Sequence, residues 1–264
     1  MSQIEKTFQH LQTAGRTALM PYLTLGYPER DSALTLVPAI AEAGADLIEL
    51  GIPFSDPLAD GPTIQASSQK ALENGMTLSL CLEQASSLRA RGVTIPFVLM
   101  GYYNPIYQFG IGRFAAQAAA SGADGVIIPD LPPEEAHAVL DAFESQGLDL
   151  ILLLAPTSNA TRIRMVAELA RGFIYLVSLV GTTGARGHVA GDLPDFVDRV
   201  RAETDKPLAV GFGISTPDQA AQVAGLADGV IVGSALINVV GAAESPEDAA
   251  REFIAALRGG VDAS

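Results

Sequence analysis

A glutamate inside an apolar run is the residue of this sequence whose type and place first suggest chemistry. Glu49 lies in the run Leu47-Ile48-Glu49-Leu50-Gly51, which is typical of a strand buried on both faces of a parallel sheet. An ionised, unpaired carboxylate is costly there, so the side chain must be paired, protonated or in use. The sequence therefore predicts either a structural carboxylate, held by a backbone donor or an arginine, or a group that transfers protons.

A loop with two more carboxylates follows directly. The segment Pro53–Pro62 holds Asp56 and Asp60 between prolines. Asp-Pro and Asp-Gly are common turn pairs, which explains either aspartate on its own. However, the loop continues the run that carries Glu49, and two carboxylates of one pocket, one buried and one on a loop, are the usual groups of general acid–base catalysis.

Glycines end two consecutive apolar runs in the last quarter of the chain. They lie in Gly211-Phe212-Gly213-Ile214-Ser215 and in Gly233-Ser234-Ala235. Small residues let backbone N–H groups approach an anion, and a helix starting at Ser215 or Ser234 would add its positive end. The loops after strands seven and eight hold a phosphate in many α/β barrels. Since neither element contains Lys or Arg, we expect any phosphate to be held by neutral amides.

Other reactive groups are scarce. The lysines, Lys6, Lys70 and Lys206, all lie away from the carboxyl ends of the predicted strands, so no lysine is placed to form a Schiff base. The three histidines are scattered and lack the spacing of metal ligands, so no metal site is predicted. Tyr175, in the run Phe173–Val177, is either a core aromatic with a satisfied hydroxyl or a substrate contact.

Composition limits the class of protein. The chain has 264 residues, 48% of them hydrophobic, which is enough for one large core. With 16 Lys plus Arg against 30 Asp plus Glu, the net charge is −14, which disfavours nucleic-acid and anionic membrane partners. A single cysteine excludes an internal disulfide and favours a reducing compartment. No signal-peptide pattern or run of transmembrane length is found, so we expect a cytoplasmic protein.

Short apolar runs alternate with amphipathic stretches along the whole chain, the pattern of repeated βα units. We count eight units and predict one domain, residues 1–264, folded as a (β/α)8 TIM barrel. An extra N-terminal helix, Ser2–Gln12, is expected to cap its closed end. The predicted strands are Ala18–Leu25, Ala45–Leu50, Ile95–Met100, Gly125–Ile128, Leu148–Leu154, Phe173–Val177, Leu208–Gly211 and Gly229–Val232. The predicted helices lie near Ser32–Ala43, Ser79–Arg91, Ile111–Ala120, Pro133–Ser145, Ala160–Ala170, Leu193–Ala202, Pro217–Ala224 and Glu247–Leu257.

The motifs together resemble the tryptophan synthase alpha subunit family. The most specific is Leu47–Pro57 followed by Ala59–Gln65. Further matching motifs occur in family order at Met100–Pro105, Ile128–Pro132, Ile174–Ser178, Gly184–Arg186 and Gly211–Ser215. The sequence departs from the family's usual pattern at Leu179-Val180-Gly181-Thr182, in the second long connection, Gly181 to Asp192. We expect this connection, which follows a strand, to close over the substrate.

The resemblance implies a lyase that cleaves indole-3-glycerol phosphate to indole and glyceraldehyde 3-phosphate by a retro-aldol reaction. It implies that Glu49 transfers the protons and that Asp60 accepts the indole N–H. The substrate contacts it implies are Tyr22, Met100, Ile127, Leu153, Tyr175, Thr183 and Phe212. The phosphate contacts are Gly184, Gly213, Gly233 and Ser234.

The resemblance also implies a partner, a tryptophan synthase beta subunit in an alpha2beta2 assembly. That subunit would receive the indole and carry pyridoxal phosphate, with no cofactor in this chain. The surface expected to contact it contains Pro53, Asp56, Asn104, Pro105, Asp130 and Pro132. The alternatives are a stand-alone indole-3-glycerol-phosphate lyase, an isomerase of a phosphosugar or phosphoribosyl amine, and a phosphate-binding barrel without turnover, against which the intact Glu49 and Asp60 argue.

Overall fold

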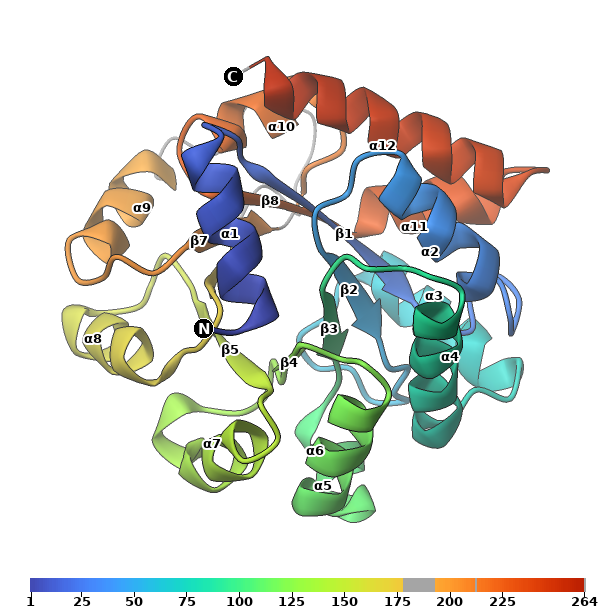
Figure 1. Cartoon of the computed structure of the whole chain (residues 1–264), viewed down its shortest axis with the longest axis horizontal. Coiled ribbons are helices and arrows are strands. Elements are labelled where there is room, and N and C mark those ends of the chain that lie inside the picture. The colour runs from blue at the N-terminus through green and yellow to red at the C-terminus, as the bar shows by residue number, and fades with distance from the viewer. Residues whose placement is uncertain (178–192, 212, 264) are drawn as a thin grey trace.

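Eight parallel strands form a closed barrel in this protein (Figure 1). The computed structural model describes residues 1–177, 193–211 and 213–263. Each strand pairs with the next along the chain, and β8 returns to pair with β1. The strands are β1 Ala18–Thr24, β2 Ile48–Gly51, β3 Phe97–Met100, β4 Gly125–Ile127, β5 Asp149–Leu154, β6 Ile174–Val177, β7 Leu208–Gly211 and β8 Gly229–Val232. The prediction of a (β/α)8 barrel is confirmed.

Helices surround the barrel and follow its strands (Figure 1). The α-helices are α1 Gln3–Thr13, α2 Ala33–Glu42, α3 Pro62–Glu73, α4 Leu78–Ala90, α5 Tyr103–Phe109, α6 Ile111–Ala120, α7 His137–Glu144, α8 Ala160–Leu169, α9 Leu193–Arg201, α10 Pro217–Ala224, α11 Ser234–Ala242 and α12 Pro246–Asp262. A 3-10 turn, η1 Pro133–Glu135, precedes α7. No helix in the described ranges is long and apolar enough to cross a membrane.

The strand boundaries differ from the prediction mainly at their ends. β7 and β8 begin and end as predicted, whereas β2 begins at Ile48 rather than Ala45 and extends through Gly51. The shift arises because Ile48 is the first residue of this run in register with β3, opposite Phe97. Glu49 is therefore the second residue of β2, directly before Leu50.

Three helices were missed or incompletely predicted, α3, α5 and α11. The buried face of α3 contains two serines, Ser67 and Ser68, beside only two apolar side chains, so the apolar period of a helix is weak there. α5 has only seven residues, and Pro105 is the third of them. α11 was anticipated only as a possible helix start at Ser234. The predicted helix Pro133–Ser145 is divided into η1 and α7.

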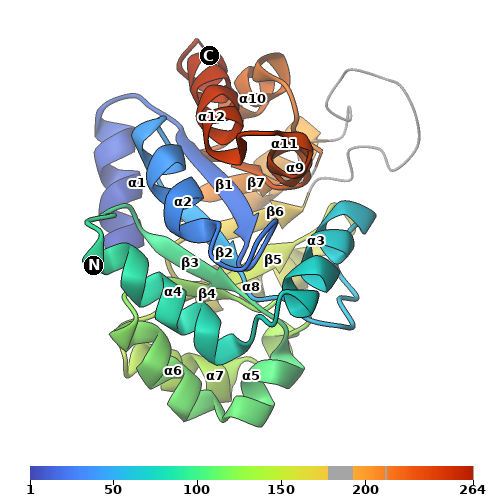
Figure 2. The ribbon, with the colours of Figure 1, turned by 90° about the vertical axis from the view of Figure 1, so that its right-hand side faces the viewer.

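The interior of the barrel is filled from one end by α1. Ile4, Phe8 and Leu11 are buried and belong to the same cluster as inward-facing strand residues such as Met20 and Phe173. The rings of Phe8 and Phe173 lie 5.7 Å apart. α1 lies at the opposite end of the barrel from α3 (Figure 2). The prediction that the N-terminal segment caps the closed end is therefore confirmed, and the other end is left for the site.

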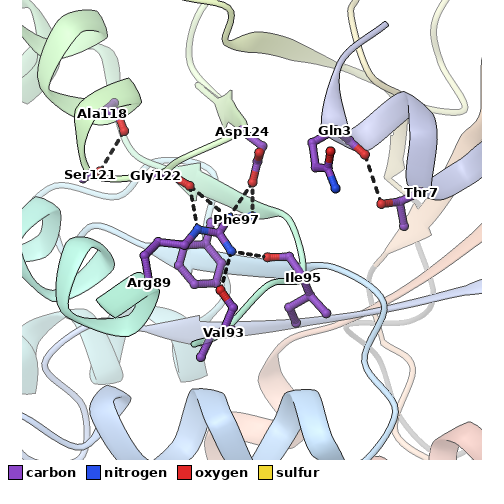
Figure 3. Close-up of polar contacts among 10 residues, drawn as sticks. All are labelled: Gln3, Thr7, Arg89, Val93, Ile95, Phe97, Ala118, Ser121, Gly122 and Asp124. Atoms are coloured by element: carbon purple, nitrogen blue, oxygen red, sulfur yellow. Dashed lines mark hydrogen bonds and ion pairs between the residues drawn. The ribbon is translucent and has the colours of Figure 1, made fainter. Parts of the chain in front are cut away.

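Aspartates at the closed end join neighbouring strands. Asp124, just before β4, accepts the N–H of Phe97 in β3 at 2.8 Å and an Arg89 N–H at 2.7 Å (Figure 3). The same Arg89 donates to the carbonyls of Val93, Ile95 and Gly122. Equivalent arrangements of an aspartate, an arginine and a strand N–H involve Asp46 with Arg258 and Asp228 with Arg201. These pairs join the start of each strand to its neighbour.

Candidate active site

A cavity of about 230 Å³ opens at the carboxyl ends of the strands. Eight of its lining residues were predicted from the sequence: Tyr22, Glu49, Asp60, Met100, Tyr175, Gly213, Gly233 and Ser234. The others were not singled out as site residues: Gly61, Ile64, Ile214, Ser215, Ile231, Ala235 and Asn238. Ile64 and Ala235 lie within motifs quoted from the sequence, Ala59–Gln65 and Gly233-Ser234-Ala235, whereas no sequence signal marked Asn238, on α11.

Five predicted contact residues are not among those lining residues. Ile127 is fully buried in the cluster that fills the barrel. Leu153 lies instead along a second depression, with Pro129–Pro133 and Arg162. Thr183, Gly184 and Phe212 lie outside the described residues, as does the connection expected to close over the substrate.

Glu49 lies on β2, opposite Tyr22 of β1 and Val98 of β3. Its side chain is 1% exposed, and its Oε1 atom has no hydrogen-bond partner within the described part of the chain. Burial penalises the charged form and raises the pKa of Glu49 to about 8. No arginine or backbone donor of the described ranges holds this carboxyl group, so the protein keeps a neutral acid in the cavity at neutral pH.

Asp60 lies in the loop between β2 and α3, just before the N-cap residue Gly61. Partial burial raises the pKa of Asp60 to about 6, and a hydrogen bond with the Tyr102 hydroxyl opposes the shift. Because the pKa of Asp60 lies below that of Glu49, the two carboxyl groups are in different states at neutral pH, Asp60 ionised and Glu49 protonated.

Tyr102 shapes the loop that carries Asp60. Its hydroxyl oxygen accepts the N–H of Ala59 at 3.0 Å, and its ring lies 5.3 Å from the ring of Phe54. Tyr102 is 4% exposed and is the N-cap residue of α5. The sequence showed Tyr102 only as part of the motif Met100–Pro105, because its hydrogen-bond partner Ala59 lies 43 positions earlier in the chain.

Two glycines at strand ends make room for tyrosines. A Cβ atom at Gly51 would lie 2.1 Å from the hydroxyl oxygen of Tyr22, and one at Gly211 would lie 2.2 Å from that of Tyr175. Such distances are far inside van der Waals contact. Gly211 was predicted to help bring the backbone near an anion. In the structure, position 211 has no room for a side chain, because the Tyr175 hydroxyl occupies that space.

The N-terminus of α11 is better suited to bind an anion than the N-terminus of α10. At α10, the side chain of Thr216 caps the helix, and Gln219 Oε1 accepts the Ser215 N–H at 2.9 Å. At α11, the N-cap residue Gly233 supplies no side-chain hydrogen bond. In the described part of the chain, the first N–H groups of α11 therefore lie at the cavity without a capping side chain and, with the helix dipole, favour an anion.

The residues expected to contact a partner lie around this end of the barrel. Asp56, Asn104, Asp130 and Pro132 are exposed, Pro105 is partly exposed, and Pro53 is buried. The N–H of Tyr103, at the start of α5, donates to Asp130 Oδ1 at 2.8 Å. Pro53 therefore cannot contact a partner unless the loop moves, whereas the other five residues are accessible.

No cluster of metal-ligating side chains occurs among the residues that the structure describes. The lysines of the chain are also absent from the cavity lining. The polar groups that the described residues bring to this cavity are two carboxyl groups, the hydroxyls of tyrosines and serines, the side-chain amide of Asn238 and backbone amides.

Comparisons with known proteins agree on one family. The family model described as "Tryptophan synthase alpha chain" matches residues 8–263. The tryptophan synthase alpha chain of Roseiflexus sp. (strain RS-1) is 56% identical over 261 residues, which is 98% of this chain and 100% of the relative. That of Geobacter sulfurreducens is 51% identical over 261 residues, 98% of each chain. Among solved structures, tryptophan synthase subunit alpha from Legionella pneumophila has a TM-score of 0.93 at 40% identity and full coverage of both chains. A chain of tryptophan synthase from M. tuberculosis in its aminoacrylate-bound form has a TM-score of 0.90 at 37% identity, covering 99% of this chain and 100% of that one.

Proposed function

Because this chain belongs to the tryptophan synthase alpha chain family, we propose that it cleaves indole-3-glycerol phosphate to indole and glyceraldehyde 3-phosphate, as a single domain over residues 1–264. The observation that carries the proposal is the pair of carboxyl groups in one cavity, Glu49 with a pKa of about 8 and Asp60 with a pKa of about 6. At neutral pH this pair supplies one proton donor and one negative charge. The retro-aldol cleavage needs both.

Glu49 performs two proton transfers in this proposal. Its neutral carboxyl group first gives a proton to indole C3, which leaves Glu49 ionised and places a positive charge on the ring. The Glu49 carboxylate then takes the proton of the hydroxyl on the adjacent carbon. The O–H electron pair forms the aldehyde C=O bond, the bond from C3 to the glycerol chain breaks, and its electron pair returns to the ring. Glu49 ends protonated, ready for the next turnover.

Asp60 stabilises the charge that appears between these transfers. The positive charge of the C3-protonated ring is centred at the indole nitrogen, and the ionised Asp60 carboxylate accepts the N–H and interacts with this charge. Tyr22, Met100 and Tyr175 provide flat or apolar walls for the ring. A fixed carboxylate in a partly buried place interacts more strongly with developing charge than one in water.

Release of indole from indole-3-glycerol phosphate tests the proposal, measured with and without an added tryptophan synthase beta subunit. Release of both products is expected in each case. If the substrate is bound but not cleaved, the chain is a phosphate-binding barrel without turnover. Full activity with no detectable complex with the beta subunit would favour a stand-alone lyase.

The pH dependence of kcat/KM should be bell-shaped. Asp60 must be ionised, so activity falls below its pKa of about 6, and Glu49 must carry a proton, so activity falls above its pKa of about 8. The optimum is expected between these values. In Asp60→Asn the residual activity should lose the acid limb and retain the alkaline limb. A profile that is flat from pH 5 to 9, where titration alone should lower kcat/KM about tenfold at each end, would contradict the two roles.

The phosphate group is held in this proposal by backbone amides of Gly233 and Ser234, at the N-terminus of α11, and of Gly213, in the connection after β7. A test must block the anion without straining the backbone. Gly213 has a φ of +81°, so any side chain there is strained as well as obstructive. Gly233 has a φ of −114°, and an added Cβ would meet Tyr22 Cβ at 3.5 Å, an ordinary contact. Gly233 is therefore the cleaner site for substitution.

Gly233→Val should weaken binding of glycerol 3-phosphate, measured by calorimetry, by about 10-fold or more, because a side chain occupies the space of the anion. Binding of indole should be unaffected. Gly112→Val is the matched control, since a Cβ at Gly112 meets nothing within 4 Å. Equal affinities of the Gly233→Val variant and the wild type for glycerol 3-phosphate would place the phosphate elsewhere.

The partner in this family is the tryptophan synthase beta subunit, and we propose an alpha2beta2 assembly with this chain. The accessible residues Asp56, Asn104, Pro105, Asp130 and Pro132 surround the end of the barrel that opens to the cavity. We propose that pyridoxal phosphate belongs to the partner, because no lysine lines the described cavity. Docking against Asp56 would act on the loop that ends at Asp60, so substrate and partner should bind cooperatively.

A further inference from the structure

A row of three hydroxyl groups leads from α3 to the active-site cavity, and the mechanism above does not use it. Ser67 Oγ and Thr24 Oγ1 lie 2.7 Å apart, and both residues are buried, at 1% and 0% exposure. Thr24 Oγ1 in turn donates to the hydroxyl oxygen of Tyr22 at 3.3 Å. Tyr22 lines the cavity. The row therefore joins a helix outside the barrel to a side chain that faces the substrate.

The direction of the row follows from a count of protons, because each hydroxyl has one. Thr24 gives its proton to Tyr22, so the contact between Thr24 and Ser67 is completed by the proton of Ser67. Ser67 Oγ also donates to the carbonyl oxygen of Ile64 at 2.9 Å, so its single proton is shared between that carbonyl and Thr24. The proton of Tyr22 has no acceptor among the hydrogen bonds of the described residues, so it is available to a group in the cavity.

The Tyr22 side chain spans the distance between the two ends of the site. Its Cβ lies near Gly233, where an added Cβ would be 3.5 Å away, and its hydroxyl lies over Gly51. On β1, Tyr22 is in register with Glu49. The hydroxyl thus lies at the carboxylate end of the cavity, away from the α11 N-terminus. Burial and, to a lesser extent, the nearby Asp60 carboxylate raise the pKa of Tyr22, which keeps the hydroxyl protonated.

We propose that Tyr22 donates a hydrogen bond to an oxygen at the reacting end of the substrate's glycerol chain, and that Thr24 and Ser67 are positioning residues that orient this donor. The inference rests on the proposed function, which supplies the substrate. It adds a polar, specificity-determining role to a side chain otherwise needed only as an apolar wall for the indole ring. A donor at this oxygen favours a polyol phosphate over an alkyl phosphate of the same length.

A double-mutant cycle with Tyr22→Phe and Ser67→Ala tests the inference, with kcat/KM for indole-3-glycerol phosphate as the readout. Tyr22→Phe should lower kcat/KM by about 5- to 10-fold, the effect of one neutral hydrogen bond, and Ser67→Ala by about 2- to 3-fold. The double variant should be no slower than Tyr22→Phe alone, because Ser67 acts only through Tyr22. Thr24→Val, which removes the middle hydroxyl, should behave as Ser67→Ala does. The Kd of indole, which has no glycerol oxygen, should not change in any of these variants.

Ser121→Ala is the matched control. Ser121 is also a buried serine that donates to the carbonyl three residues before it, that of Ala118 at 2.8 Å (Figure 3). Ser121 is the C-cap residue of α6 and does not line the cavity, so its loss should affect the unfolding midpoint as Ser67→Ala does and leave kcat/KM unchanged. A row that is only structural would give additive effects in the cycle or none, and either result overturns the inference. If the wild type fails to release indole, the proposed function fails with it, whereas an active wild type with unchanged Tyr22→Phe kinetics refutes this inference alone.

Discussion

Glu49→Gln should reduce indole release by at least about 10²- to 10⁴-fold, the range for removal of a general acid–base group. The amide keeps the shape of the side chain but can neither give a proton to indole C3 nor take one from the hydroxyl. Binding of glycerol 3-phosphate and of indole should change little, because Glu49 holds neither the phosphate nor the indole nitrogen in the proposed mechanism. Steady-state kinetics and calorimetry on the isolated chain measure both quantities.

The same variant should be more stable than the wild type at alkaline pH. Folding raises the pKa of Glu49 from 4.5 to about 8, so the native state holds a proton that the unfolded chain releases. The favourable contribution is complete below about pH 4.5 and is lost as the pH rises through 8. Gln does not titrate, so the urea midpoint of Glu49→Gln should exceed that of the wild type at pH 9 and match it more closely at pH 5. A folded variant with near-normal turnover would refute the assignment of Glu49.

Asp60→Asn should also lose most of its activity, by a barrier increase of about 3 kcal/mol, or roughly 10²-fold in kcat. The amide retains a hydrogen-bond acceptor for the indole N–H but lacks the negative charge that stabilises the protonated ring. The loss is therefore expected in kcat more than in the affinity for indole. Pre-steady-state kinetics separates the two.

Asp56→Asn is the matched control for Asp60, assayed in the isolated chain. Asp56 belongs to the same loop, but it is exposed, and its carboxylate accepts a bond from the neighbouring Ser55 hydroxyl. Removing its charge should leave the isolated chain active and weaken only the complex with a beta subunit. If Asp60→Asn is as active as Asp56→Asn, then Asp60 is a turn residue and the charge of the ring is stabilised by another group.

Much of the architecture could be predicted from local patterns. Eight apolar runs separated by amphipathic stretches lead to an eightfold barrel, because a parallel sheet with helices on its outer face needs strands of that kind. Glu49 could be singled out from the same pattern, because a carboxylate among the apolar residues of a buried strand is costly unless it is paired, protonated or in use. The glycines near Gly233 could be placed at a strand end from the alternation alone.

Contacts between distant segments decided the rest. α3 was missed because its buried serine Ser67 is satisfied by Thr24, which lies 43 positions earlier in the chain, and no local pattern shows such a partner. Ile127 and Leu153 stay predicted substrate contacts: Ile127 is buried in the cluster that fills the barrel, and Leu153 packs against that cluster and lies along a second depression. Which residues of a strand face a cavity depends on the stagger of all eight strands.

From the sequence alone one can derive the fold class and predict that Glu49 and Asp60 form an acid–base pair and that two strand ends hold a phosphate. The folded structure is needed to show that burial keeps the pKa of Glu49 above that of Asp60, that Tyr102 holds the Asp60 loop, and that α10 has a side-chain cap whereas the N-cap residue of α11 supplies none. The reason is physical: residue type and spacing record what a side chain can do, whereas its pKa and its hydrogen-bond partners depend on burial and on groups that folding brings from elsewhere in the chain.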